Sequence, residues 1–221
     1  MPRADFDRHL HSLRDDLLVL GSMVEKAIAR SVDALKRRDL DASRQVIAED
    51  DAIDQKRFQI EEQCVELIAT QQPAARDLRM LFSILQIAVE LERMGDYAEG
   101  IAKITVKMGD EPLIKPLIDV PRMAEKATDM LRRSLDSLVN RDVVAARQVC
   151  KDDDEVDALY DQVYRELIFF MLQDSKTIKQ ATYLLWVAHD LERIADRATN
   201  IAERVIYLVT GKMTELNVPS Y

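Results

Sequence analysis

Internal repetition constrains this chain more than any other feature of its sequence. The segment LERMGDYAEGIA at residues 91–102 returns as LERIADRATNIA at residues 191–202, an offset of 100. Upstream, RDLDASRQV at 38–46 matches RDVVAARQV at 141–149, an offset of 103. The offset changes between these two stretches, where a turn would tolerate a change in length. Two homologous units therefore make up most of the 221 residues.

The residues within each unit favour helices. Only five glycines and six prolines interrupt the chain, and residues with high helix propensity dominate the rest. Apolar residues spaced three and four apart predict helices over about 5–38, 39–70 and 75–108. Asp39 is the expected N-cap of the second helix. After a connector rich in proline, the same pattern predicts helices near 120–140, 142–173 and 176–210.

The predicted fold class is therefore all-α, with six long helices in two tandem, homologous three-helix bundles. We place the first repeat at residues 1–110, the connector at 111–120 and the second repeat at 121–221. No apolar run approaches the roughly 20 residues that span a bilayer, and the charged N-terminus does not resemble a signal peptide. Two cysteines without metal-ligand spacing suit a reducing compartment. We expect a soluble, cytoplasmic protein.

Composition also restricts the classes of binding partner that we expect. The formal net charge is −9, and we find no basic face that would neutralise the phosphates of a nucleic acid. We therefore expect no nucleic-acid partner. Cations and basic protein surfaces are the expected partners instead.

Each repeat carries two pairs of acids four residues apart, and such spacing places both carboxylates on one face of a helix. Their Cβ atoms lie roughly 5–6 Å apart, and like charges in this arrangement repel unless a cation joins them. Because the second and third helices of a bundle are neighbours, two pairs can surround one site. Oxygen ligands favour Mg²⁺, Ca²⁺, Mn²⁺ or iron over a thiolate and imidazole zinc site. The candidate metal ligands are Asp50, Asp54, Glu92, Asp96, Asp153, Asp157, Glu192 and Asp196.

Asn200 could add an amide oxygen to the second site. Its counterpart in the first repeat is Gly100, so we expect the two sites to differ in coordination.

Chance explains some of this spacing, because an acidic chain also places Glu62 and Glu66 four apart. The recurrence of both pairs at matched positions favours metal ligation. We expect no enzyme, because the chain lacks Glu-x-x-His, G-x-S-x-G and Ser/His/Asp signatures. Two alternatives remain open: a metal-dependent hydrolase or oxidase that uses the same acids, and a structural helical module whose acids are only solvated.

These motifs resemble those of the PhoU family of bacterial phosphate-signalling proteins along nearly the whole chain. The resemblance rests on DDAIDQ (50–55), DDEVDA (153–158), QQPAARDLR (71–79) and the two LER segments. It implies two similar three-helix bundles whose acidic motifs carry metal: multinuclear iron or zinc clusters, or Mn²⁺ or Mg²⁺. By motif position it assigns the eight acids above as ligands, with Asn200 as a further candidate.

The resemblance also implies a biological role. PhoU-like proteins are cytoplasmic negative regulators of phosphate uptake and of phosphate-starvation gene expression. They link the ATPase subunit of the phosphate ABC transporter to a sensor histidine kinase, so this chain would reach the membrane only through its partners. On the same grounds we expect a homodimer.

The sequence departs from the family pattern at three positions. Tyr97 and Arg197 stand where the family commonly has histidine, and Gly100 replaces an asparagine. These departures leave the composition of the metal sites open.

Overall fold

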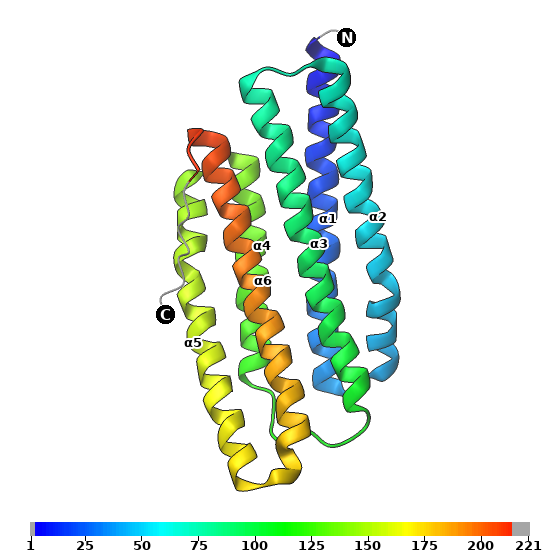
Figure 1. Ribbon diagram of the computed structural model, residues 1–221, viewed down its shortest axis with the longest axis vertical. Coiled ribbons are helices and arrows are strands. Elements are labelled where there is room, and N and C mark those ends of the chain that lie inside the picture. The colour runs from blue at the N-terminus through cyan, green and yellow to red at the C-terminus, as the bar shows by residue number, and fades with distance from the viewer. Residues whose placement is uncertain (1–2, 214–221) are drawn as a thin grey trace.

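The computed structural model describes residues 3–213, and its long elements are all α-helices (Figure 1). The all-α prediction with six long helices is confirmed for this part of the chain. A short 3₁₀ turn, η1, covers the start of the last predicted helix. The outer ends of the predicted repeats, residues 1–2 and 214–221, lie outside the described residues. The elements are α1 (Arg3–Arg37), α2 (Leu40–Gln71), α3 (Ala75–Met108), α4 (Asp119–Asn140), α5 (Val143–Gln173), η1 (Ser175–Thr177) and α6 (Ile178–Thr210).

The repeat is visible in the two turns that join the first and second helix of each unit. Asp39 caps α2 by accepting a hydrogen bond from the Ala42 amide, and Asp142 caps α5 in the same way. Arg38 and Arg141, one residue before each cap, both adopt the left-handed conformation, with φ of 57° and 54°. The same local sequence thus builds the same turn twice, which fixes where α2 and α5 begin.

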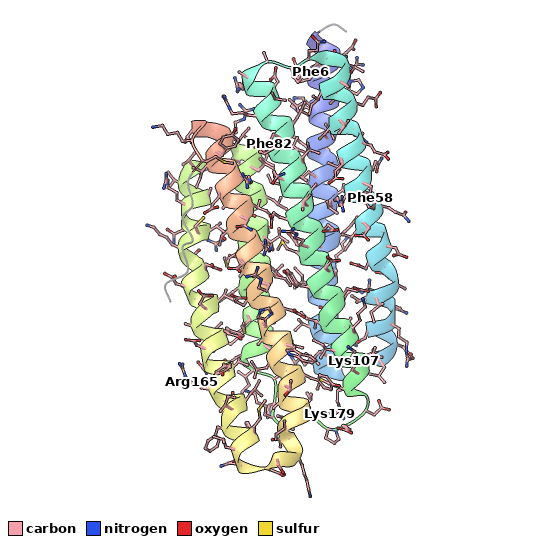
Figure 2. The ribbon with its side chains drawn as sticks, in the orientation of Figure 1. Phe6, Phe58, Phe82, Lys107, Arg165 and Lys179 are labelled. Atoms are coloured by element: carbon pink, nitrogen blue, oxygen red, sulfur yellow. The ribbon has the colours of Figure 1, made fainter. Side chains whose placement is uncertain are left out.

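Helices α1–α3 form one bundle and α4–α6 form another beside it (Figure 1). The two bundles join where α3 packs against α6 and α1 packs against α4. Small buried side chains, including Ala98, Ala102, Ala198 and Ala202, lie on α3 and α6. One continuous hydrophobic cluster runs through both bundles, and the outer helices α2 and α5 flank it. Charged side chains cover the outer faces (Figure 2).

Within residues 3–213, we find no helix with a stretch long and apolar enough to cross a bilayer. Cys64 and Cys150 are both free and buried, so each packs as a small core residue.

Candidate metal site

Three carboxylates of the first repeat meet where α2 packs against α3. Asp50 and Asp54 lie one turn apart on α2, and Asp96 lies on α3; one oxygen from each falls within 4.8 Å of the others. Oxygen ligands lie about 2.0–2.6 Å from Mg²⁺ or Ca²⁺, so two oxygens on opposite sides of one ion are about 4–5 Å apart. Asp50 and Asp54 are half-buried, whereas Asp96 is exposed. The geometry suits one cation at the rim of the bundle.

The charges around these carboxylates are unbalanced. Burial, and after it the nearby Glu99, Asp96 and Asp54, raises the pKa of Asp50 to about 6, although Lys103 acts to lower it. Burial and neighbouring acids also raise the pKa of Asp96. Asp54 Oδ1 is buried and has no hydrogen-bond partner among the described residues. A buried, unpaired carboxylate oxygen is costly, and a cation would satisfy it, so the donor set fits a bound metal.

A glycine allows the two helices to approach this closely. A Cβ at Gly95 would lie 3.1 Å from two carbons of Ile53 and 3.4 Å from Asp50 Oδ1. In the second repeat the corresponding pair is Ala195 and Val156, both buried. Compared with the first repeat, the side chain on α5 is one methylene smaller (Val156 for Ile53) and the side chain on α6 is one methylene larger (Ala195 for Gly95). In the first repeat, α3 therefore has no side chain at the position next to Asp50.

Glu92, the fourth acid predicted for this site, lies outside the group of three. Its Oε1 is 3.3 Å from Nη2 of Arg57, a half-buried residue of α2. Arg57 also donates to Glu61 Oε2 at 2.8 Å. The structure therefore brings together three of the four predicted first-repeat ligands and pairs the fourth with an arginine.

The acids of the second repeat are arranged differently. Within residues 3–213 they form no group comparable to the first. Burial, and after it Asp196, raises the pKa of Glu192 to about 7, although Arg193 acts to lower it. Burial and then Asp196 raise the pKa of Asp157, and Asp153 is 2% exposed.

An arginine enters this second set of acids. Arg193 Nη1 lies 2.5 Å from Asp196 Oδ2, so one of the predicted ligands of this repeat is paired with an arginine. Glu192 Oε2 is nevertheless buried without a hydrogen-bond partner among the described residues. The acids of the two repeats are thus arranged differently in this structure.

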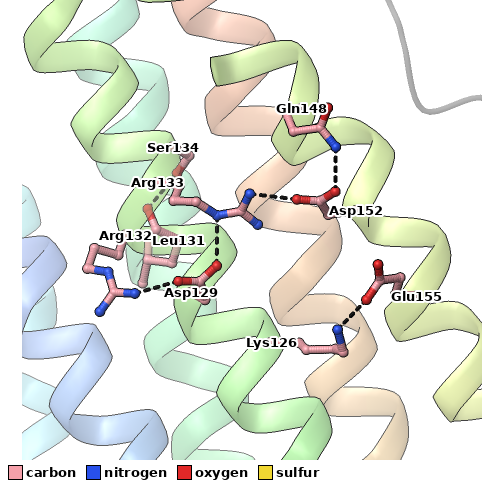
Figure 3. Close-up of polar contacts among 9 residues, drawn as sticks. All are labelled: Lys126, Asp129, Leu131, Arg132, Arg133, Ser134, Gln148, Asp152 and Glu155. Carbon is pink, nitrogen blue, oxygen red and sulfur yellow. Dashed lines mark hydrogen bonds and ion pairs between the residues drawn. The ribbon is translucent and has the colours of Figure 1, made fainter. Parts of the chain in front are cut away.

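An ordinary paired acid on α5 shows the contrast. Asp152 accepts hydrogen bonds from Arg133 at 2.6 Å and from Gln148 at 2.7 Å (Figure 3). Burial acts against ionisation here, but these two partners lower the pKa of Asp152 below its usual value. The pKa of Asp50 is shifted in the opposite direction, because burial raises it and the neighbouring acids add to that effect.

Asn200 reaches across to the other bundle. Its Nδ2 donates to Glu90 Oε2 on α3 at 3.2 Å, and Arg197 Nη1 contacts the same oxygen at 3.2 Å. The counterpart of Glu90 is Asp190, which faces Gly100 instead: a Cβ there would lie 3.0 Å from Asp190 Oδ2. Burial raises the pKa of Asp190 to about 7. In this structure Arg197, which departs from the family pattern, and Asn200, which matches it, therefore both serve a contact between the bundles.

Two residues at the first site were not predicted from the sequence. Glu99 is close enough to Asp50 to raise its pKa, and its position three residues after Asp96 was a usable signal. Arg57 was not identifiable in this way, because its contact with Glu92 depends on how α2 and α3 pack.

Comparison with known proteins gives the family. The PhoU domain matches residues 17–105 and 120–205 of this chain. The chain belongs to the PhoU family. A phosphate-specific transport system accessory protein PhoU homolog of Clostridium acetobutylicum is 40% identical, over 98% of this chain and all of that protein. The corresponding homolog of Aquifex aeolicus is 38% identical, over 94% of each chain.

Solved PhoU structures share the fold. The crystal structure of PhoU from Pseudomonas aeruginosa matches with a TM-score of 0.89 and 36% identity, over 94% of this chain and all of that one. The phosphate transport system regulatory protein PhoU from Streptococcus pneumoniae matches with a TM-score of 0.89 and 32% identity. That match covers 96% of this chain and all of the other. The two PhoU domain matches fall on the two three-helix bundles described above.

Proposed function

We propose that this PhoU-family chain is a metal-binding regulator of phosphate homeostasis. In this proposal it restrains phosphate uptake and phosphate-starvation signalling in the cytoplasm, as a non-enzymatic adaptor. It couples the ATPase subunit of a phosphate ABC transporter to a sensor histidine kinase, and it acts as a homodimer. Relatives named as phosphate-specific transport system accessory proteins cover nearly the whole chain, which supports a role in regulating phosphate transport.

The observation that carries the metal part of the proposal is the group of Asp50, Asp54 and Asp96. These three carboxylates come from two helices, have one oxygen each within 4.8 Å of the others, and include a buried oxygen without a partner. Such a set binds a hard cation, with Mn²⁺, Mg²⁺ and iron as the first candidates and zinc as a further one. We propose a second, different site at Asp153, Asp157, Glu192 and Asp196. Glu92 and Asn200 stay predicted ligands that would have to leave Arg57 and Glu90.

The adaptor role is tested in cells. Deletion of the gene should raise expression of phosphate-starvation genes in phosphate-rich medium, and the wild-type gene should restore repression. The variant Asp50→Asn/Asp96→Asn should restore it poorly if the metal is required. The control is Asp51→Asn, which removes one carboxylate from an exposed position on α2 beside the site. Unchanged expression after deletion would refute the regulatory role.

The partners and the oligomeric state need separate measurements. Pull-down with the purified transporter ATPase and with the cytoplasmic part of the kinase should retain both partners. Sedimentation should give a mass near twice the 25.3 kDa of one chain. A monomer at all concentrations, or a chain that binds neither partner, would refute this part of the proposal.

A further inference from the structure

Arginines gather around a cavity lined by residues of the start of α3 and the end of α6. Figure 1 shows where these two helix ends lie in the molecule. Two adjoining hollows there have volumes of about 260 and 280 Å³. Both are lined by Leu10, Arg76, Asp77, Met80 and Arg141, which come from α1, α3 and the turn after α4. The cavity therefore lies where the two bundles meet.

Four guanidinium groups line this cavity, and they come from three parts of the chain. Arg76 and Arg79 are on the first turns of α3, Arg14 is on α1, and Arg141 is in the turn between α4 and α5. In a chain with a net charge of −9, such a gathering of positive charge is unusual. The QQPAARDLR segment supplies two of the four, and the carboxylate site makes no use of them.

The four arginines are poorly neutralised. Within residues 3–213 none of them forms an ion pair of the kind seen elsewhere in the molecule. Arg14 donates to the carbonyl oxygen of Val139 at 3.2 Å. Arg79 Nε is buried and has no hydrogen-bond partner among these residues. A buried donor without a partner costs free energy. A ligand that offers an acceptor to Arg79 Nε would remove this cost.

The arginines also repel one another. Burial lowers the pKa of Arg141, and the positive charges of Arg76 and Arg14 lower it further. Asp7 and Asp77 are the acids on the cavity wall. Two carboxylates against four guanidinium groups leave an excess of positive charge, which an anion would balance.

We propose that this cavity binds a small oxyanion of the phosphate class, held by Arg14, Arg76, Arg79 and Arg141. Guanidinium groups are suited to this ligand, because each presents a planar set of donors that matches two phosphate oxygens. The volume lies just below the roughly 300–1,000 Å³ of sites for drug-sized molecules. It therefore suits one anion with a few waters better than a whole cofactor.

The anion site is separate from the carboxylate site. Arg79 and Asp96 both lie on α3, seventeen positions apart, which corresponds to about 26 Å along a helix. The proposal does not depend on the metal or on the regulatory role, and either could fail without the other. Because α1, α3, α6 and the turn after α4 border the cavity, a bound anion would hold the two bundles together.

Binding is tested with the full chain in a buffer that contains chelator and no phosphate or sulfate. Inorganic phosphate is titrated by calorimetry and by thermal unfolding, against sodium chloride at equal ionic strength. We expect phosphate to raise the unfolding temperature and chloride to leave it unchanged. O-phosphoserine in a parallel titration separates a free anion from the phosphoryl group of a larger molecule. Binding of phosphate alone indicates a closed site, and similar binding of both indicates an open one.

Variants locate the site. Arg79→Gln and Arg76→Gln should each weaken phosphate binding about tenfold or more, because each removes a charged hydrogen-bond donor. Without phosphate, both variants should unfold at or above the wild-type temperature, because each removes one of the mutually repelling arginines. A cooperative transition at that temperature would show that the variants are folded. The matched control is Arg165→Gln, an exposed arginine near the opposite end of α5 (Figure 2). Absence of phosphate binding, or equal binding by all three variants and the wild type, would overturn the proposal.

Discussion

Replacement of Asp50 by asparagine should stabilise the metal-free protein. In chelator, burial and the surrounding acids raise the pKa of Asp50 from 3.8 to about 6. A rise of about two units corresponds to about 3 kcal/mol, and solvent screening at this half-buried carboxylate reduces it to about 1–2 kcal/mol. For a chain of this length, the unfolding temperature should rise by about 2–8 °C near pH 8.

The pH dependence gives the sign of the effect. Because the folded-state pKa is raised, the folded protein favours the neutral acid, and this stability is lost as the pH rises through about 6. Asparagine is always neutral, so the variant loses no stability at this position as the pH rises. The advantage of Asp50→Asn should therefore be large at pH 8, about half as large at pH 5 and small at pH 4.

The assay is thermal unfolding followed by circular dichroism, with and without Mn²⁺. The control Asp51→Asn should change the free energy of unfolding by no more than about 0.5 kcal/mol. Saturating Mn²⁺ should stabilise the wild type and reverse the order of the two proteins. The reasoning would be refuted if Asp50→Asn were no more stable than the wild type in chelator at pH 8, or if Mn²⁺ stabilised both equally.

Three further changes test other contacts. Asp190→Asn should raise the free energy of unfolding by about 1–3 kcal/mol at pH 8.5 and little at pH 4, because burial raises the Asp190 pKa to about 7; equal effects at both pH values in chemical denaturation would contradict this. Asn200→Ala should destabilise by about 0.5–1.5 kcal/mol by removing the bond to Glu90, and a neutral effect on the urea midpoint would count against that contact. Gly95→Ala should weaken Mn²⁺ binding and fail to deliver the roughly 1 kcal/mol of stability that alanine gains over glycine in a helix, because its Cβ would lie 3.1 Å from Ile53. Adding Ile53→Val should restore both, and a double variant no better than the single one would show that this packing is not the cause.

The helices and turns were predictable because they follow from local chemistry. Apolar spacing placed the helices within a few residues, and Asp39 caps α2 as predicted. Asp142 repeats the cap at the start of α5, because the repeat carries the same local signal at 39 and 142. The joining of the bundles through α3 with α6 and α1 with α4 has no comparable local signal.

The site was predictable only in part. Spacing of four identified Asp50 and Asp54 as a pair on one face, and the pairing of neighbouring helices brought Asp96 to them. The choice of Arg57 as the partner of Glu92 was not predictable, because a long arginine can reach several acids and tertiary packing decides among them. The arginine cavity was not predictable either, because Arg14 and Arg141 are distant in sequence from Arg76 and Arg79 and only tertiary packing brings them together.

The most direct test of the metal site is anomalous scattering from crystals grown with Mn²⁺ and measured at a wavelength where manganese scatters strongly. The account predicts a peak bounded by Asp50, Asp54 and Asp96, and loss of that peak in crystals of the Asp50→Asn/Asp96→Asn variant. A wild-type map without a peak at these three carboxylates, in crystals that hold manganese elsewhere, would contradict it.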